Sequence, residues 1–328
     1  MDPVLVEVTR GGRVESVHRG AVAVLDADGA VAFSAGDIEA AVFPRSAVKA
    51  LQALPLVESG AADRLGLTDA EIALACASHN GEPAHVAAAE AMLRKAGQDA
   101  GCLECGAHWP SLQAATLALA ASGAKATALH NNCSGKHSGF ICLACDAGDD
   151  PAGYVQPEHP AMRRITAALA ETTGTVLDAR NRGIDGCSIP TYAIPLQALA
   201  LAFAHFGTGH GWHPDRAAAS VRIRAAVAEH PFMIAGTGRF DTEVMQAFGA
   251  RVFAKTGAEG VYCVALPDLG LGIAVKCDDG AGRAAELVTA TLLSRFLGEG
   301  VPEKWARPVL RNWNRIEVGT LQAAAALA

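Results

Sequence analysis

The chain has little charge and no basic tract. Charged residues make up 19% of its 328 residues, and the net charge is −7 at pH 7. Proteins bind polyanionic nucleic acids with clustered lysine and arginine, so we expect no nucleic-acid partner. Hydrophobic residues make up 51% of the sequence, which is enough for a sizeable core in a compact protein with little disorder.

The sequence also lacks a long unbroken apolar run and a secretory leader. Its longest apolar stretch, 189–206, is interrupted by Pro190, Pro195 and Gln197, so it would make a poor membrane span. No charged and then apolar segment precedes a small-residue cleavage site at the N-terminus. We therefore expect a cytoplasmic protein without membrane association.

The cysteine content predicts that the protein has no disulfide framework. The nine cysteines are an odd number in a long chain without a leader, which favours a reducing compartment. Two Cys-x-x-Cys pairs occur, Cys102 with Cys105 and Cys142 with Cys145. The second pair lies in an apolar helical run, where buried thiols act as small hydrophobic side chains.

Strand-like segments occur at both ends of the chain, and no internal repeat or low-complexity linker separates them from the middle. Short valine- and alanine-rich runs occupy 4–9, 20–25, 31–34, 250–255, 260–266 and 271–277. The middle is mostly helical, with helices expected at 82–97, 110–123, 134–147, 160–173, 190–206, 214–229 and 239–248. We expect an α+β fold with one antiparallel sheet built from the N- and C-terminal strands. The sheet lobe would span about 1–60 and 250–328, and a largely helical lobe, about 61–249, would be inserted.

One stretch, Phe43-Pro44-Arg45-Ser46-Ala47-Val48-Lys49, is typical of a loop that turns into a helix. Good helix formers follow Ser46. Residues three apart lie on one face of a helix, so Ser46 and Lys49 can place a hydroxyl beside an amine. Such a pair can act as nucleophile and base, although an N-cap serine beside a solvated lysine gives the same pattern.

Two further motifs favour the catalytic interpretation. Ser78-His79-Asn80 is a Ser-x-Asn motif, and Lys255-Thr256-Gly257 lies near the end of an expected strand. With Ser46 and Lys49 they follow the order found in serine β-lactamases and penicillin-binding proteins. Lysine takes a serine proton only when neutral, and burial or a nearby positive charge such as Lys255 lowers its pKa. The residues equally define a second pair, Ser78 with Lys255, so the attacking serine stays open.

A second polar set surrounds two cysteines. Cys133 lies in the glycine-rich stretch 131–139, and Cys187 lies in the polar turn 185–188. These residues can serve as helix caps and close-packing glycines, as a catalytic cysteine with His137 nearby, or as a metal site. Zinc suits thiolate ligands, but two cysteines would need further ligands to complete its coordination.

Taken together, these motifs resemble the L-asparaginase II family of the Rhizobium etli type. The resemblance runs over nearly the whole chain and rests on six stretches: Phe43–Lys49, Ser78–Asn80, Asn131–His137, Asp185–Cys187, Ala235–Asp241 and Lys255–Gly260. It implies the fold of the serine β-lactamases and glutaminases. It also implies hydrolysis of L-asparagine to L-aspartate and ammonia by a homodimer.

The resemblance further implies roles for individual residues. The catalytic residues would be two Ser-Lys pairs, Ser46 with Lys49 and Ser78 with Lys255. The zinc ligands, completed by water, would be Cys133, Lys136 and Cys187. A lysine ligand is unusual because the amine must lose its proton to bind a metal. The residues that orient this zinc site without binding the metal would be His137 and Asp185.

The leading hypothesis is therefore an asparaginase that forms a serine acyl-enzyme. We expect the substrate's α-carboxylate, α-amine and amide to be held by Arg45, Asn80, Gly236, Thr237, Gly238 and Arg239. An arginine can bind a carboxylate bidentately, and the sequence does not say which one does so. Two alternatives stay open: an amidohydrolase with Cys133 as nucleophile, and a non-catalytic zinc-binding protein with a lactamase-like cleft. Asparagine and glutamine differ by one methylene, so their discrimination is not evident from the sequence.

Overall fold

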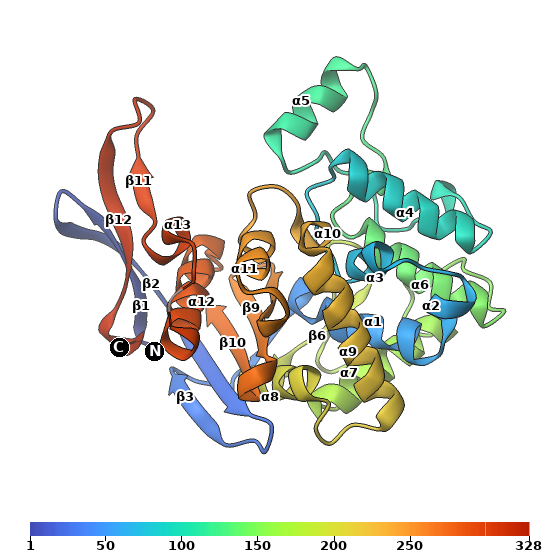
Figure 1. The fold of residues 1–328 in the computed structure, drawn as a ribbon, viewed down its shortest axis with the longest axis horizontal. Helices are drawn as coiled ribbons and strands as arrows, with labels where there is room; N and C mark the ends of the chain where they lie inside the picture. The colour runs from blue at the N-terminus through green and yellow to red at the C-terminus, as the bar shows by residue number, and fades with distance from the viewer. Residues whose placement is uncertain (299, 328) are drawn as a thin grey trace. The chain divides into compact units, whose positions relative to one another are not determined.

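A computed structural model describes residues 1–298 and 300–327, and it divides the chain into two compact units. Unit 1 consists of Met1–Ala47, Ile194–Thr208 and Glu243–Ala328. Unit 2 consists of Val48–Ala193 and Gly209–Thr242. Unit 1 contains the large sheet, whereas unit 2 is mostly helical (Figure 1).

Unit 1 is built on an antiparallel sheet whose strand order is β11-β12-β1-β2-β10-β9-β8, with β3 paired to β2. The strands are β1 (Val4–Arg10), β2 (Arg13–Asp26), β3 (Val31–Ala35), β8 (Phe253–Gly257), β9 (Val261–Leu266), β10 (Leu271–Cys277), β11 (Val309–Arg311) and β12 (Glu317–Ala323). The long β2 pairs with β10 from Gly20 opposite Cys277 to Asp26 opposite Leu271. This pairing confirms the expected α+β fold, in which strands from both ends of the chain form one antiparallel sheet.

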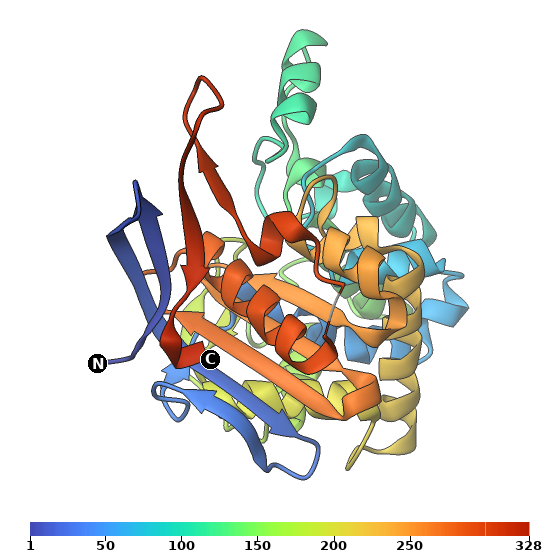
Figure 2. The ribbon, with the colours of Figure 1, turned by 60° about the vertical axis from the view of Figure 1, so that its left-hand side comes forward.

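Two helices cover the sheet of unit 1. Helix α8 (Leu196–Thr208) packs on β2, β9 and β10, and α12 (Gly282–Leu297) crosses the other face (Figure 2). A Cβ on Gly272 of β10 would lie 1.9 Å from the carbonyl oxygen of Ala200, so the approach of α8 depends on a glycine there. The apolar 189–206 stretch is thus largely a sheet-covering helix. Within the described part of the chain, we find no helix with the length and apolarity that crossing a membrane requires.

Unit 2 is a helical assembly around α6. Its main helices are α1 (Lys49–Glu58), α2 (Ala61–Arg64), α3 (Asp69–Ala75), α4 (Pro83–Lys95), α5 (Gln113–Ala121), α6 (Ser134–Asp146), α7 (Pro160–Thr173), α9 (Pro214–Glu229) and α10 (Pro231–Ala235). Prolines occupy the first position of α4, α7, α9 and α10, where the missing N–H costs nothing. Helix α6 packs against α1, α3, α4 and α7, so the Cys133 stretch opens the central helix of the unit.

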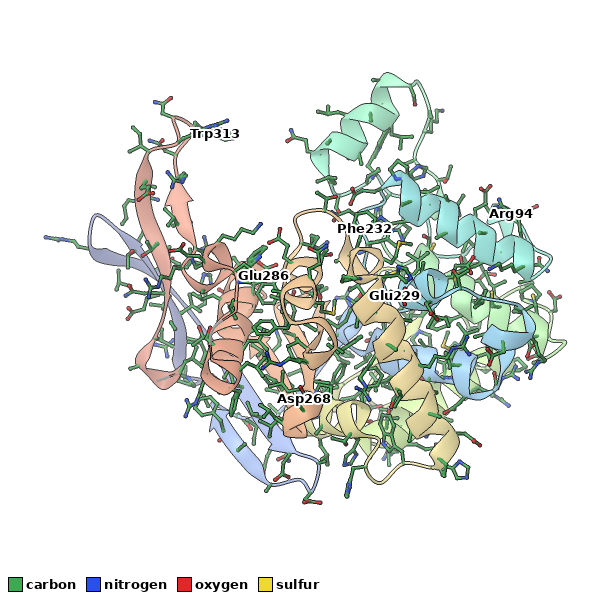
Figure 3. All side chains as sticks on the ribbon, in the orientation of Figure 1. Arg94, Glu229, Phe232, Asp268, Glu286 and Trp313 are labelled. Atoms are coloured by element: carbon green, nitrogen blue, oxygen red, sulfur yellow. The ribbon has the colours of Figure 1, made fainter. Side chains whose placement is uncertain are left out.

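Several smaller elements complete the fold. Short pairs join β4 (Ala41–Val42) to β7 (Ile194–Pro195) in unit 1, and β5 (Arg182–Ile184) to β6 (Pro190–Tyr192) in unit 2. Helix α11 (Phe240–Phe248) runs from unit 2 into unit 1. The β11–β12 hairpin was not expected from the sequence, and Trp313 lies fully exposed at its tip (Figure 3). Helix α5 has no buried residue and projects from unit 2 (Figures 1 and 2).

Candidate active site

Ser46 lies in a strained turn of unit 1. We expected a helix that begins at Ser46, but residues Arg45–Val48 form a 3-10 turn, η1, and α1 begins only at Lys49. Arg45 leads into the turn with a φ of 51°, a left-handed conformation that non-glycine residues rarely adopt. Such strain persists only where the surrounding structure enforces it, and it clusters at functional sites.

The Lys255-Thr256-Gly257 motif at the end of β8 lies against this turn. A Cβ on Gly257 would be 2.3 Å from the carbonyl oxygen of Pro44 and 3.1 Å from the backbone nitrogen of Ala47. Only glycine allows the strand to come so close. The lysine of the motif is fully buried, and its amine donates to the Thr256 carbonyl at 2.9 Å. Unit 1 therefore brings the Ser46 turn and the third sequence motif together.

In unit 2, the amine of Lys49 holds a second serine. Lys49 is 1% exposed, and its Nζ donates to Ser78 Oγ at 2.9 Å and to the Ala77 carbonyl at 2.5 Å. The same Nζ lies 3.1 Å from Cys133 Sγ. Burial lowers the pKa of Lys49, and the positive charge of Lys136 adds to this, although the Cys133 thiolate opposes it. A buried amine whose charged form is disfavoured is suited to accept a proton from the Ser78 hydroxyl.

Close helix packing places Ser78 beside the Cys133 stretch. A Cβ on Gly135 of α6 would lie 2.4 Å from the carbonyl oxygen of Leu74 on α3, so glycine allows the two helices to touch. The Ser78 N–H donates to the Ile234 carbonyl at 2.8 Å, and the His79 N–H donates to the Asn132 carbonyl at 3.2 Å. The glycine-rich character of this stretch thus has a packing cause.

His79, the residue after Ser78, is fixed in place by hydrogen bonds at both of its ring nitrogens. Its Nδ1 accepts a hydrogen bond from the Gly81 N–H at 3.0 Å, so its Nε2 carries the proton and donates to Ser134 Oγ at 3.0 Å. The ring is fully buried and stacks on His85 with centroids 4.8 Å apart. Burial holds the pKa of His79 well below its usual value. His79 is therefore neutral and hydrogen-bonded at both ring nitrogens, so its role is to position the chain next to Ser78 rather than to carry protons.

Cys133, Lys136 and Cys187 form a buried cluster of two thiols and an amine in unit 2. Lys136 Nζ lies 3.1 Å from Cys187 Sγ. The hydrogen bond from Cys187 and the nearby amines of Lys49 and Lys136 lower the pKa of Cys133, and the Cys133 thiolate in turn raises the pKa of Cys187. Burial opposes charge on Lys136, yet Cys133, Cys187 and Asp185 together raise its pKa. The directions of these shifts favour a Cys133 thiolate and a charged Lys136 amine within the cluster.

The donor set of this cluster fits zinc only if lysine takes part. Among residues 1–298 and 300–327 no group of three histidine, cysteine, aspartate or glutamate side chains is placed to bind a metal. Two thiols and one amine do converge, and thiolates suit zinc. The raised pKa of Lys136 means that a metal would have to displace a strongly held proton from this amine.

His137 and Asp185 flank the cluster differently. His137 is fully buried; its Nδ1 is bonded to the Tyr154 hydroxyl at 2.6 Å, and its Nε2 has no hydrogen-bond partner within the described residues. The carboxylate of Asp185 accepts from the Gly186 N–H at 2.6 Å and favours the charged form of Lys136. Since Tyr154 occupies Nδ1 and Nε2 has no partner among the described residues, His137 makes no hydrogen bond to Cys133 of the kind that a cysteine nucleophile would use.

The predicted substrate-binding residues of unit 2 lie together, because Asn80 is hydrogen-bonded to the loop formed by residues 236–239. Arg239 Nη1 donates to Asn80 Oδ1 at 3.2 Å, and Asn80 Nδ2 donates to the Thr237 carbonyl at 3.0 Å. Glu82 also reaches this loop, accepting from the Thr237 N–H at 2.8 Å and from its hydroxyl at 2.7 Å. Sequence reasoning missed Glu82, because Glu82-Pro83 was interpreted only as the start of a helix. Arg45, the other predicted arginine, belongs to unit 1.

A serine hydroxyl held by a buried, preferentially neutral amine is an arrangement suited to hydrolases that work by nucleophilic attack. A family model described as L-asparaginase II matches residues 6–323, and the chain belongs to this family. It is accordingly an amidohydrolase.

Other comparisons add little to this assignment. No curated protein sequence matches the chain. Among solved structures, a protein named Mglu is 17% identical, with 85% of this chain and 67% of that chain covered and a TM-score of 0.39. A Bacteroides dorei protein described as a β-lactamase is 13% identical, covering 85% and 93%, with a TM-score of 0.43. A Mycobacterium bovis β-lactamase is 14% identical, covering 84% and 94%, with a TM-score of 0.34.

Proposed function

We propose that this protein hydrolyses L-asparagine to L-aspartate and ammonia through a serine acyl-enzyme. The observation that supports this mechanism is the 2.9 Å hydrogen bond between the buried Lys49 amine and Ser78 Oγ, in a chain of the L-asparaginase II family. Within that family we place the chain in the Rhizobium etli type, on the motifs quoted above.

In the proposed reaction a serine Oγ attacks the side-chain carboxamide carbon of asparagine. Its proton passes to neutral Lys49 and then to the departing nitrogen, so ammonia leaves and a β-aspartyl ester remains. Water hydrolyses this ester and restores the serine. We assign the attack to Ser46, which is more exposed than Ser78 and lies in the strained turn against β8. Ser78 then relays protons to Lys49, and Lys255 supplies positive charge.

The α-carboxylate of the substrate is the natural ligand of Arg239. Asn80 Oδ1 accepts from one nitrogen of this guanidinium at 3.2 Å and so orients it. The neighbouring Gly236 and Gly238, together with the Thr237 carbonyl, offer backbone groups for the α-amine and the amide, whereas the Thr237 N–H is bonded to Glu82. Arg45 remains the candidate from unit 1, and the two arginines are distinguished by separate substitution.

We also propose that Cys133, Lys136 and Cys187 hold a zinc ion, with Asp185 and His137 orienting the site. Bound zinc would supply a fixed positive charge beside the Lys49 amine, favouring its neutral form. The chain would contribute two thiolates and an amine that loses its proton on binding; all three side chains are buried, and Lys136 Nζ lies 3.1 Å from Cys187 Sγ. Elemental analysis of the purified protein, before and after treatment with a chelator, tests this proposal.

A homodimer in the cytoplasm completes the proposal, as the family resemblance implies. Light scattering over a range of concentrations measures the oligomeric state, and a constant mass of one chain would contradict a dimer.

The acyl-enzyme is tested by rapid acid quench during asparagine turnover, followed by peptide mass spectrometry. We expect an aspartyl ester on the peptide that contains Ser46 and loss of ammonia release in Ser46→Ala. If folded Ser46→Ala keeps wild-type turnover and the ester appears on Ser78, then Ser78 is the nucleophile. If wild-type protein releases no ammonia from L-asparagine, the proposed substrate is wrong.

A further inference from the structure

Glu82 is tied to the substrate loop by more hydrogen bonds than its place at the start of α4 requires. Its Oε1 accepts from the Thr237 backbone N–H at 2.8 Å, and its Oε2 accepts from the Thr237 hydroxyl at 2.7 Å. A carboxylate that accepts two hydrogen bonds from one residue fixes both the position and the orientation of that residue. Thr237 lies two residues before Arg239, so this clasp acts on the loop that carries the proposed carboxylate ligand.

The backbone of the loop is shaped to receive this carboxylate. Gly236 adopts a φ of 98°, and a Cβ there would lie 2.4 Å from Glu82 Oε1 and 3.1 Å from Asn80 Cβ. Any other side chain would therefore push Glu82 away from Thr237, besides adopting an unfavourable conformation. The glycine that the sequence motif contains at this position thus makes room for the clasp.

The clasp is one of several links between residues 78–82 and residues 234–239. The Ser78 N–H donates to the Ile234 carbonyl at 2.8 Å, Asn80 Nδ2 donates to the Thr237 carbonyl at 3.0 Å, and Glu82 holds Thr237 from its other side. The chain from 78 to 82 therefore runs beside the chain from 234 to 237. Glu82 is the acidic residue of the 78–82 segment.

We propose that Glu82 is a positioning residue for substrate binding: it clamps the Gly236–Arg239 loop so that the Arg239 guanidinium is set for the α-carboxylate. This inference rests on the proposed function, in which Arg239 binds that carboxylate. Without the clasp, the Thr237 N–H and hydroxyl turn to water and the loop gains conformational freedom. Ordering the loop then draws on binding energy, which raises KM while the reacting serine and lysine stay in place.

Three substitutions of Glu82 distinguish the effect of its side-chain length from the effect of its negative charge. Glu82→Gln keeps the length of the side chain and can still accept from the Thr237 N–H, so we expect KM for L-asparagine within about threefold of wild type. Glu82→Asp keeps the charge and remains a good N-cap for α4, but it is one methylene too short to reach Thr237. Glu82→Asp and Glu82→Ala should each raise KM about tenfold, with kcat nearly unchanged. Glu90→Ala, at an exposed position of the same helix, is the matched control.

A double-mutant cycle with Arg239 makes the inference decisive. If Glu82 acts by placing Arg239, then Glu82→Ala adds no further rise in KM to Arg239→Ala, or to Arg239→Lys where alanine leaves too little activity. The inference would be overturned if the KM increases of the two single variants multiplied in the double variant. It would also be overturned if the Glu82 variants lowered kcat at constant KM, or if Glu82→Gln behaved like Glu82→Ala. Thermal melts of every variant show whether the protein has kept its fold.

Failure of the underlying function has a different signature. If wild-type protein releases no ammonia from L-asparagine, the proposed substrate fails irrespective of Glu82. If Arg239→Ala leaves KM unchanged, Arg239 is not the carboxylate ligand, and the positioning role through it is overturned as well.

Discussion

The contact of Gly257 with the Ser46 turn lends itself to a quantitative prediction. A methyl group at position 257 would lie 2.3 Å from the Pro44 carbonyl oxygen, whereas ordinary contact begins near 3.4 Å. The turn or the strand must therefore move by about 1 Å to accommodate Gly257→Ala. Overpacking of this kind typically costs about 1–3 kcal/mol of folding free energy, and a 1 Å misplacement can cost about 10²-fold in rate.

The assay is continuous ammonia release from L-asparagine with purified Gly257→Ala at a temperature well below its melting point. Gly282→Ala is the matched control in the same unit, because nothing lies within 4 Å of its Cβ position at the start of α12. We expect the control to keep wild-type kcat, with stability unchanged or slightly higher. We expect kcat of Gly257→Ala to fall about 10²-fold while circular dichroism shows a folded protein.

The reasoning would be refuted by a folded Gly257→Ala that keeps kcat within about twofold of wild type, since such a rate leaves no room for a 1 Å displacement of a reacting group. Equal loss of activity in Gly282→Ala would instead show a general sensitivity of unit 1. A rise in KM alone would point to substrate binding rather than to the geometry of the serine turn.

Three further predictions follow from unit 2. Lys49→Met should lower kcat by at least about 10²-fold with the fold retained, because it removes the amine bonded to Ser78; activity close to wild type would exclude Lys49 as the base. Cys187→Ser should weaken zinc binding more than tenfold by equilibrium dialysis, whereas Cys145→Ser, a thiol outside the cluster, should not; equal zinc affinity in both would remove Cys187 from the ligand set. His79 folds neutral, since burial and the nearby His85, Lys49, His108 and His130 all lower its pKa. Its contribution to the free energy of unfolding is full above the unfolded pKa of about 6.5 and is lost as pH falls, by up to about 1.4 kcal/mol per pH unit. Urea titrations at pH 7 and pH 5 should show that His79→Gln loses less unfolding free energy between these pH values than wild type does. An equal loss in both proteins would contradict this assignment.

Most elements follow from local signals in the sequence. Short valine-rich runs predict β1, β9 and β10, and Pro83, Pro160 and Pro214 mark helix starts that the structure confirms. The β11–β12 hairpin escaped prediction because its side chains are mostly exposed or half-buried and show no apolar alternation, and β11 is the edge strand of the sheet. The start of α1 was misplaced by three residues, because helix propensity alone does not reveal the left-handed conformation of Arg45 or the 3-10 turn that precedes Lys49.

In the candidate site, too, the sequence identified the residue types, whereas the structure was needed to show which residues pair. Motif order identified Ser46, Lys49, Ser78 and Lys255 as a set, but their pairing depends on distances between segments far apart in the chain. The structure shows the Lys49 amine on Ser78, a pair that neither motif contains alone. Glu82 carried no sequence signal beyond its position before Pro83, since its partner Thr237 is 155 residues away.

The amino-acid sequence by itself determined the α+β composition, the helix starts at prolines and the residue types available for chemistry, because these depend on neighbours within a few positions. Only the tertiary structure decided which hydroxyl receives the Lys49 amine, that Cys133 and Cys187 share a buried cluster with Lys136, and that Glu82 holds the Arg239 loop. These outcomes depend on close approaches at Gly135, Gly236 and Gly257, where the absence of a side chain lets distant segments meet. A missing Cβ acts through space, so its partner is not evident from the sequence.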